Sequence, residues 1–282
     1  MRIARERAMR KDFGEDATVL ADWLSHWLSG GGSLLFMTDY DGTLTPHVPD
    51  PAEARLEPGV RRHLSALVRA PNVRLAVISG RDLGDVAQRV AVPGAVYAGC
   101  HGFVIDGPGI AFSHPEALAQ QPIVRALGEA LARRASSIPG MRVETKRLGL
   151  TVHYRHMSDA GRRTLEIELA RAINQGPSGR LKLFHGTKAI EILPQVGWSK
   201  GHCALRIWKW ALGALPPPML SVYIGDDWTD ELAFGKLVGQ AITVRVGPPE
   251  AASRAMYRLD GVEGVHRLLE RLVEASSPQG AA

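Results

Sequence analysis

The sequence predicts an α/β fold in which a doubly wound, Rossmann-like parallel sheet is interrupted by an inserted α+β domain. Two apolar runs, Ser33–Thr38 and Val73–Ile78, are each followed by a helical segment, which is typical of parallel strands buried on both faces. Residues 102–189 instead contain short alternating segments, which are typical of antiparallel strands. We therefore expect a core domain in two parts, 1–101 and 190–282, and an α+β cap domain at 102–189.

The first part of the core is expected to begin with a helix at Ala17–Ser29, where apolar residues recur every three or four positions. The strand Ser33–Thr38 follows this helix. The next helix opens at Pro58, because proline is favoured in the first turn of a helix. After the strand Val73–Ile78, Asp82 is expected to cap a further helix.

The insert is expected to begin with a β-hairpin that turns at 107–109. Helices are expected near 122–136 and 160–174, with strands between them. Polar and apolar residues alternate in 151–155, which favours a strand with one exposed face. These elements together predict an α+β domain rather than a continuation of the parallel sheet.

The core pattern is expected to return with a strand at 189–193 and a helix after Ser199. An apolar run at 220–224 predicts another buried strand. A strand at Ile242–Val246 and a helix near 264–274 complete the predicted core.

The composition narrows the class of protein. The chain has 34 Lys and Arg against 29 Asp and Glu, a formal net charge of +5, which alone would suit a nucleic-acid binder. However, no basic cluster with interleaved aromatic residues or zinc-ligand spacing is present, so we do not expect nucleic acid as a partner. No apolar run approaches the roughly 20 residues that span a bilayer, so we do not expect a membrane either. The two cysteines, Cys100 and Cys203, form no disulfide framework, and the N-terminus lacks the apolar core of a signal peptide. A cytoplasmic location is therefore expected.

Candidate catalytic carboxylates follow the first predicted strand. Asp39 and Asp41 come directly after Ser33–Thr38, and ligands of open parallel sheets bind at the carboxyl ends of strands. Residues two apart beyond a strand can direct both carboxylates toward one centre. Gly42 and Thr43 then offer backbone N–H groups in a tight turn that suits a phosphate.

Polar residues also follow three later strands. Ser79, Gly80 and Arg81 come after Val73–Ile78, at a glycine-containing turn before a helix, which suits phosphate binding. Lys200 follows the strand that contains Glu191, and an acidic segment that includes Asp226, Asp227 and Asp230 follows the strand 220–224. Because each group follows a strand, we expect them to gather at one edge of the sheet.

In order along the chain, these segments resemble the four motifs of the haloacid dehalogenase-like (HAD) phosphohydrolases. The finer strings resemble the trehalose-6-phosphate phosphatase family: DYDGTLTP at 39–46, ISGR at 78–81, GCHG at 99–102, HYR at 153–155, EILP at 191–194 with a following KG, and YIGDDWTDE at 223–231. The resemblance extends over nearly the whole chain. It implies Mg²⁺-dependent hydrolysis of trehalose 6-phosphate to trehalose and phosphate through an aspartyl-phosphate.

The resemblance also implies a role for each core residue. Asp39 would be the nucleophile, and Asp41 the acid that protonates the leaving oxygen and the base that then activates water. The metal ligands would be Asp39, the backbone carbonyl of Asp41, and Asp226 or Asp227. The phosphoryl group would be held by Ser79 and Lys200, and the wider phosphate-binding set is Asp41, Gly42, Thr43, Ser79, Gly80, Arg81 and Lys200. Asp227 or Asp230 would orient the loop and Lys200.

Elementary chemistry supports this interpretation. Phosphate monoesters react slowly because the nucleophile must attack an anion, and a carboxylate nucleophile divides the reaction into two easier steps. A divalent cation offsets the repulsion between the carboxylate and the phosphate, and Mg²⁺ prefers a small set of hard oxygen ligands.

The insert is expected to select the substrate. Strand alternation places Glu144 and Lys146 on one face, and His153 and Arg155 on one face. The resemblance implies that these four residues contact the sugar, although the family string VEDK reads VETK here, with Thr145 in place of aspartate. Among the remaining polar residues, Glu191 and His101 are further substrate-binding candidates.

Two other functions stay open, together with the question of partners. A phosphatase of another phosphorylated glycoside, such as sucrose phosphate, glucosylglycerol phosphate or mannosyl-phosphoglycerate, is the nearest alternative. A non-catalytic regulatory protein with the same fold is more remote, because Asp39 and Asp41 are both present. A synthase of trehalose 6-phosphate is a candidate functional partner, and a monomer is favoured. Residues 102–189 contain 13 basic and seven acidic residues, so the excess positive charge is expected to form a basic lid that attracts an anionic sugar.

Overall fold

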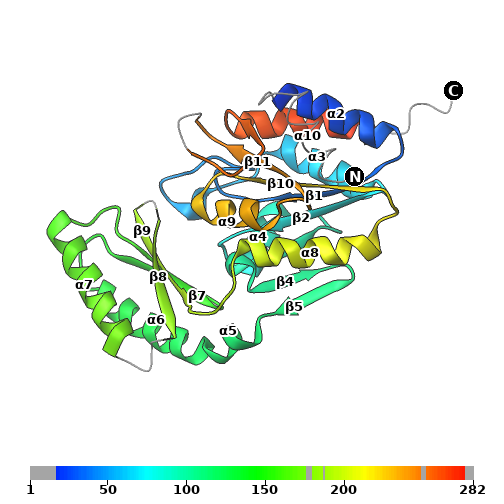
Figure 1. Ribbon diagram of the computed structural model, residues 1–282. Coiled ribbons are helices and arrows are strands. Elements are labelled where there is room, and N and C mark those ends of the chain that lie inside the picture. The colour runs from blue at the N-terminus through cyan, green and yellow to red at the C-terminus, as the bar shows by residue number, and fades with distance from the viewer. Residues whose placement is uncertain (1–16, 176–179, 187, 249–251, 277–282) are drawn as a thin grey trace. The chain divides into compact units, whose positions relative to one another are not determined.

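The computed structural model describes residues 17–175, 180–186, 188–248 and 252–276 (Figure 1). The chain forms two compact units, unit 1 with Met1–Phe112 and Trp198–Ala282, and unit 2 with Ser113–Gly197. The segment 1–16, for which the sequence predicts no signal peptide, lies outside the described residues. No helix in the described part of the chain is both long and apolar enough to cross a membrane.

Unit 1 contains an eight-stranded sheet in the order β12-β11-β10-β1-β2-β3-β4-β5. Its strands are β1 (Ser33–Thr38), β2 (Val73–Ile78), β3 (Val96–Gly99), β4 (Val104–Gly107), β5 (Ile110–Ser113), β10 (Met219–Gly225), β11 (Ile242–Val246) and β12 (Tyr257–Leu259). The strands from β12 to β3 pair in parallel, and β4 pairs antiparallel with β3. With β1 central between β10 and β2, the carboxyl ends of these three strands lie at the same edge of the sheet.

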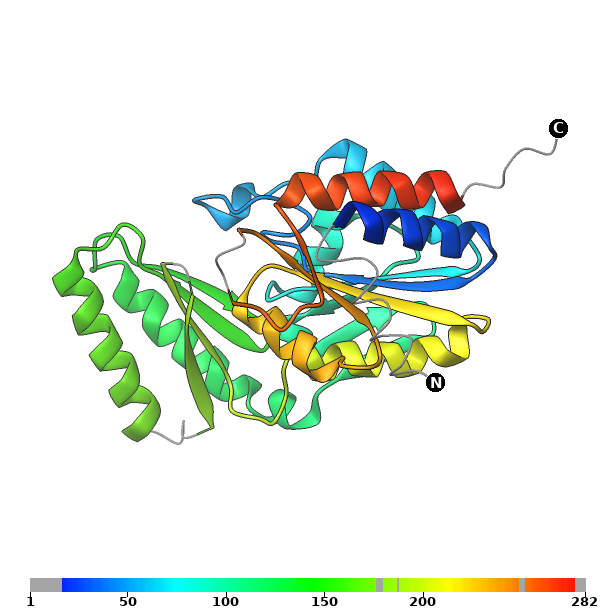
Figure 2. The ribbon, with the colours of Figure 1, turned by 45° about the horizontal axis from the view of Figure 1, so that its top comes forward.

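Helices cover both faces of this sheet (Figure 2). The helical segments of unit 1 are α2 (Ala17–Ser29), η1 (Pro51–Glu53), α3 (Pro58–Arg69), α4 (Leu83–Val90), η2 (Cys100–Gly102), α8 (Lys200–Ala214), α9 (Trp228–Lys236) and α10 (Val262–Ser276). One apolar core lies between the sheet and α2, α3, α4 and α10, and the other lies between the sheet and α8 and α9.

The residues of β1 show why this strand is central. Leu34 and Phe36 lie in the first core, whereas Leu35 and Met37 lie in the second, and all four are fully buried. A strand buried on both faces needs apolar residues at every position, which explains the continuous run in the sequence. The predicted doubly wound α/β fold is therefore confirmed.

Unit 2 is a four-stranded sheet with helices packed on one face. The strand order is β6-β7-β9-β8, and the pairs are antiparallel. The elements are α5 (Pro115–Ala119), α6 (Gln121–Ala135), β6 (Arg142–Lys146), β7 (Gly149–His153), α7 (Asp159–Gln175), β8 (Leu181–Gly186) and β9 (Ala189–Pro194). Apolar residues of α6 and α7 pack against Leu150, Val152, Ile190 and Ile192 of the sheet. The opposite face of the strands carries polar residues.

Two elements belong to different sheets from those expected from the sequence. The hairpin β4–β5, expected in the insert, extends the large sheet of unit 1, because Val104 and Ile105 are buried beside β3. The strand at 189–193, expected to pair in the core sheet, is β9 of the small sheet. Its alternation is that of a half-buried strand, since Ile190 and Ile192 are buried while Glu191 is only partly buried. Unit 2 therefore covers Ser113–Gly197, whereas the insert was expected at 102–189.

Candidate active site

The loop after β1 places Asp39 at the carboxyl edge of the sheet. The Asp39 N–H donates to the carbonyl of Ile224, which extends the pairing of β1 with β10, and the side chain is 6% exposed. Gly42 adopts a positive φ of 84°, and a Cβ at this position would overlap the carboxylate of Asp226. Only glycine satisfies both conditions, so Gly42 allows the loop after β1 to approach the loop after β10.

The N–H groups of Gly42 and Thr43, which were expected to bind phosphate, have hydrogen-bond partners within the loop. The Gly42 N–H donates to the carbonyl of Thr45 at 2.7 Å, and the Thr43 N–H donates to the carbonyl of Tyr40 at 3.4 Å. The Thr43 hydroxyl donates to Asp226 at 3.2 Å. The two N–H groups thus form hydrogen bonds within the turn, and the Thr43 hydroxyl joins the turn to Asp226.

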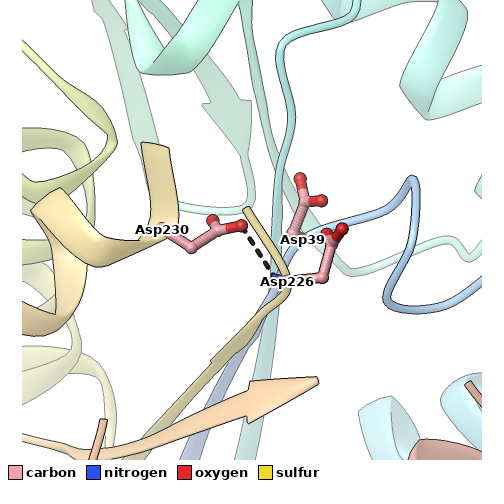
Figure 3. A group of neighbouring side chains, drawn as sticks. All are labelled: Asp39, Asp226 and Asp230. Atoms are coloured by element: carbon pink, nitrogen blue, oxygen red, sulfur yellow. Dashed lines mark hydrogen bonds between the residues drawn. The ribbon is translucent and has the colours of Figure 1, made fainter. Parts of the chain in front are cut away.

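Three carboxylates meet at this edge: Asp39, Asp226 and Asp230 (Figure 3). One oxygen from each lies within 4.8 Å of the others, a spacing that suits a bound cation. Asp39 comes from the end of β1, Asp226 from the loop after β10, and Asp230 from the first turn of α9. Carboxylate oxygens are the hard ligands that Mg²⁺ prefers.

Lys200 lies between two of these carboxylates. Its Nζ donates to Asp39 at 2.8 Å and to Asp230 at 2.9 Å, and all three side chains are buried. Burial raises the pKa of Asp39 and raises that of Asp230 to about 7, while the ammonium opposes both shifts. Burial lowers the pKa of Lys200, but the carboxylates of Asp230 and Asp39 outweigh it, so Lys200 stays charged.

Asp230 joins the loop after β10 to Lys200. One of its oxygens accepts from the N–H groups of Asp226 and Asp227, at 3.1 and 3.2 Å, and the other accepts from Lys200. A Cβ at Gly225 would overlap this carboxylate, so the glycine is needed where the loop turns. The side chain of Asp230 therefore fixes the direction of the Asp226 backbone.

Asp227 performs a different task from Asp226. Its Oδ1 accepts from the N–H groups of Thr229 and Asp230 and from the Thr229 hydroxyl, so it caps α9. Burial raises the pKa of Asp227, but the charge of Lys200 and the hydrogen bond from Thr229 outweigh it and lower the pKa to about 2. Among the described residues, the group spaced for a metal contains Asp226 and not Asp227.

Arg81 binds the carboxylate of Asp41. The Nε and Nη2 atoms each lie 2.6 Å from an oxygen of Asp41, and Nη1 lies 2.9 Å from Asp85. The guanidinium also lies over the ring of Tyr40. Burial lowers the pKa of Arg81, but these carboxylates outweigh it and raise the pKa above its ordinary value. The Arg81 side chain thus contacts two carboxylates, and binding of phosphate at the Ser79–Arg81 turn stays a prediction.

The Ser79 loop is tied to the turn η2. Ser79 is buried, and its hydroxyl accepts from the Arg81 N–H at 3.1 Å. The carbonyl of Ser79 accepts from the His101 N–H at 2.9 Å, and a Cβ at Gly80 would overlap the imidazole of His101. His101 therefore packs against the Ser79 loop and holds its backbone in place.

In unit 2, four candidate residues share the polar face of the small sheet. His153 and Glu144 lie 3.0 Å apart, and Lys146 donates to Glu191 at 3.1 Å. Thr151 of β7 lies opposite both Glu144 and Glu191 in the strand register. Arg155 is the exception: β7 ends at His153, so Arg155 lies exposed in the following turn rather than on the strand face.

Sequence reasoning missed two residues of the site. The hydroxyl of Tyr223 donates to Asp230 at 2.8 Å, and its position in the apolar run of β10 made it look like an ordinary core residue. His47 lies 2.9 Å from Asp226, and this hydrogen bond raises the pKa of His47. No spacing rule connects His47 with Asp226, because the contact depends on the path of the loop after β1.

The trehalose-phosphatase family model matches residues 37–263. A trehalose-phosphate phosphatase of Mycobacterium tuberculosis strain H37Rv is 37% identical over 243 residues, which cover 83% of this chain and 60% of the relative. The chain thus spans about 60% of the length of this curated relative. The Candida albicans trehalose-6-phosphate phosphatase C-terminal domain has a similar fold, with a TM-score of 0.72, 24% identity, and coverage of 90% of this chain and 96% of that chain. A haloacid dehalogenase-like hydrolase from Bacteroides thetaiotaomicron has a TM-score of 0.57 at 18% identity, with coverage of 85% and 99%.

Proposed function

Because this chain belongs to the trehalose-phosphatase family, we propose that it hydrolyses trehalose 6-phosphate to trehalose and phosphate. The observation that carries the proposal is the convergence of Asp39, Lys200 and Asp226 at the carboxyl edge of the sheet. A buried carboxylate with an ammonium and a second carboxylate beside it can attack a phosphoryl group and stabilise the charge that develops.

In the proposed reaction, an oxygen of Asp39 attacks phosphorus and the bond from phosphorus to the sugar oxygen breaks. Asp41 gives a proton to that sugar oxygen, so trehalose leaves and an aspartyl-phosphate remains. Asp41 then takes a proton from water as the water attacks phosphorus, which releases phosphate and regenerates Asp39. Lys200 and the Ser79 hydroxyl would bind the phosphoryl oxygens during both steps.

A cation fits the carboxylate group. Asp39 and Asp226 would hold it, with the backbone carbonyl of Asp41 as a third oxygen, whereas Asp230 is already engaged by Lys200 and two N–H groups. Mg²⁺ suits this all-oxygen set and, when bound, would offset the repulsion between Asp39 and the phosphate.

Removal of divalent cations is expected to abolish phosphate release from trehalose 6-phosphate. Chelation with EDTA followed by gel filtration should leave the fold intact, and Mg²⁺ should restore activity in proportion to its occupancy. Phosphate release measured by a colorimetric assay, with circular dichroism as the check on folding, tests this expectation. Full turnover in the chelated enzyme would refute the role of the metal.

Arg81 is expected to hold Asp41 as a carboxylate in position for the second step, in which Asp41 takes a proton from water. The substitution Arg81→Lys keeps the charge but removes the two-pronged contact, so we expect kcat to fall by about 10- to 100-fold with a smaller change in KM. The matched control is Arg89→Lys on α4, whose carboxylate contacts are to Asp85 and not to Asp41. Steady-state kinetics of both variants measure the difference, and equal losses would contradict a positioning role for Arg81.

Unit 2 is proposed to be the cap domain that selects the sugar. Glu144, Lys146, His153 and Glu191 form two polar pairs on one sheet face, and paired donors and acceptors suit sugar hydroxyls. Arg155, exposed in the turn after β7, is the fifth proposed contact, and the excess of basic residues in this unit would attract an anionic substrate. Coupling to a synthase, a monomeric state and a cytoplasmic location stay predictions.

A panel of phosphate esters tests the substrate assignment. Trehalose 6-phosphate should give the highest kcat/KM among sucrose phosphate, glucosylglycerol phosphate, mannosyl-phosphoglycerate and glucose 6-phosphate. A higher value for another glycoside would reject trehalose as the sugar and keep the phosphatase. No phosphate release from any ester would favour the non-catalytic alternative.

A further inference from the structure

The chain passes between unit 1 and unit 2 twice, and the residue of unit 1 at each crossing is aromatic. The two aromatic rings stack on each other. Phe112 is the last residue of unit 1 before the chain enters unit 2, and Trp198 is the first after it returns. Their ring centroids lie 5.1 Å apart with an interplanar angle of 28°. Two residues that are far apart in the sequence therefore hold the two crossing points side by side.

The rings are fastened to the rest of unit 1 at three further points. The indole N–H of Trp198 donates to the carbonyl of Gly102 at 3.0 Å. From α8, the guanidinium of Arg206 lies 3.9 Å from the centre of the Phe112 ring, and the ring of His202 stacks with Trp198. We name Phe112, Trp198, His202 and Arg206 the crossing clamp.

On the connection that returns from unit 2, the residue directly before Trp198 is loosely packed. Gly197, the last residue of unit 2, is exposed, and a Cβ at its position would meet no atom within 4 Å. The contrast between a packed ring at 198 and an open glycine at 197 is the arrangement expected where a fixed base meets a movable segment.

Lys200 lies only two residues after Trp198, but it does not depend on the clamp. Its Nζ is held by Asp39 and Asp230, and a Cβ at Gly201 would overlap the backbone of Leu232, so α8 packs directly against α9. Cys203 and Ile207 are also buried in the core between α8 and the sheet. The catalytic lysine is therefore positioned by contacts that the clamp does not share.

We propose that the crossing clamp is a positioning device for the sugar-binding unit: it fixes the base of both connections and so determines how well sugar phosphates are turned over, without contributing to phosphoryl transfer itself. This inference rests on the proposed function, in which unit 2 contacts the sugar. A phosphate ester without a sugar, such as p-nitrophenyl phosphate, would need the core chemistry but not the clamp.

Two conservative variants test the clamp. Trp198→Phe keeps a ring and removes the indole N–H, and Phe112→Leu keeps apolar volume and removes the ring. For both, we expect kcat/KM for trehalose 6-phosphate to fall by about two- to tenfold, the effect of losing one neutral hydrogen bond or ring contact. The value for p-nitrophenyl phosphate should stay within about twofold of the parent. Trp23→Phe, the same substitution within the Trp23–Trp27 stack of α2, is the matched control and should change neither substrate.

Hydrogen exchange gives a readout that does not depend on activity. In Trp198→Phe, peptides covering 108–118 and 192–200 should exchange several-fold faster than in the parent, with no change in peptides of β1 or β10. Equal losses for both esters, unchanged kinetics with trehalose 6-phosphate, or unchanged exchange at the two connections would each overturn the proposal. If the parent enzyme hydrolyses p-nitrophenyl phosphate but no sugar phosphate, the proposed function fails instead, and the exchange experiment still tests the clamp.

Discussion

Replacement of Asp39 by asparagine is expected to reduce phosphate release by about 10⁴-fold or more, the scale seen when a nucleophile is removed from an enzyme site. The amide has nearly the same shape as the carboxylate, but it cannot form the aspartyl-phosphate. It also offers the cation a weaker ligand. Because both losses affect the chemical step, we expect the decrease in kcat, measured by phosphate release from trehalose 6-phosphate with saturating Mg²⁺.

The Asp39→Asn variant should remain folded. Burial raises the pKa of Asp39, which shows that its charge is costly inside the protein, and a neutral amide removes that cost. Lys200 keeps its ion pair with Asp230 at 2.9 Å. Asp106→Asn, at an exposed position of β4, is the matched control and should retain full activity. Undiminished turnover by a folded Asp39→Asn variant would reject the covalent mechanism.

The parallel core could be predicted from the sequence because its strands are buried on both faces. Strands such as Ser33–Thr38 and Val73–Ile78 have no exposed face, so they appear as uninterrupted apolar runs with helices between them. The short edge strands were harder to recognise. Tyr257–Leu259 has only three residues and carries no pattern, and it is a strand because it pairs with β11.

The limits of unit 2 could not be read from the sequence, because local pattern does not say which sheet a strand joins. Strand β9 leads directly into the loop before Lys200, so its position in the chain suggested the core. Strand β9 pairs with β7, which lies more than 30 residues upstream, and with β8, whose sequence shows no clear strand pattern. Strand membership is a tertiary property, whereas periodicity reports only how a strand is buried.

In the candidate site, too, the sequence predicted which residues come together but not which atoms they contact. The rule that polar residues gather at the carboxyl ends of parallel strands brought Asp39, Lys200 and Asp226 together in the prediction. The side-chain partner of each site residue, by contrast, could not be predicted from the sequence. Arg81 belongs to a phosphate-binding type of motif, but its guanidinium contacts two carboxylates that come from different elements. Asp41 lies in the loop after β1, and Asp85 lies in the first turn of α4.

Replacement of Lys200 by methionine is expected to lower the free energy of unfolding by about 3–5 kcal/mol, besides removing most activity. The substitution leaves Asp39 and Asp230 buried without the ammonium that lies within 3 Å of both. Urea denaturation followed by circular dichroism measures the loss. Lys209→Met, at an exposed position of the same helix, is the matched control and should change stability by about 0.5 kcal/mol or less.

The loss of stability in Lys200→Met should depend on pH in a defined direction. Burial already raises the pKa of Asp230 to about 7, and removal of the opposing ammonium raises it further. The folded variant then binds protons that the unfolded chain, with carboxyl pKa values near 4, releases, so its stability falls as the pH rises. The deficit relative to the parent should be smaller at pH 5 than at pH 8, and Lys200→Met/Asp230→Asn should recover part of it at pH 8, because one buried charge is gone. An equal deficit at both pH values would mean that the lost packing of the lysine stem, and not the unpaired buried charge, causes the destabilisation.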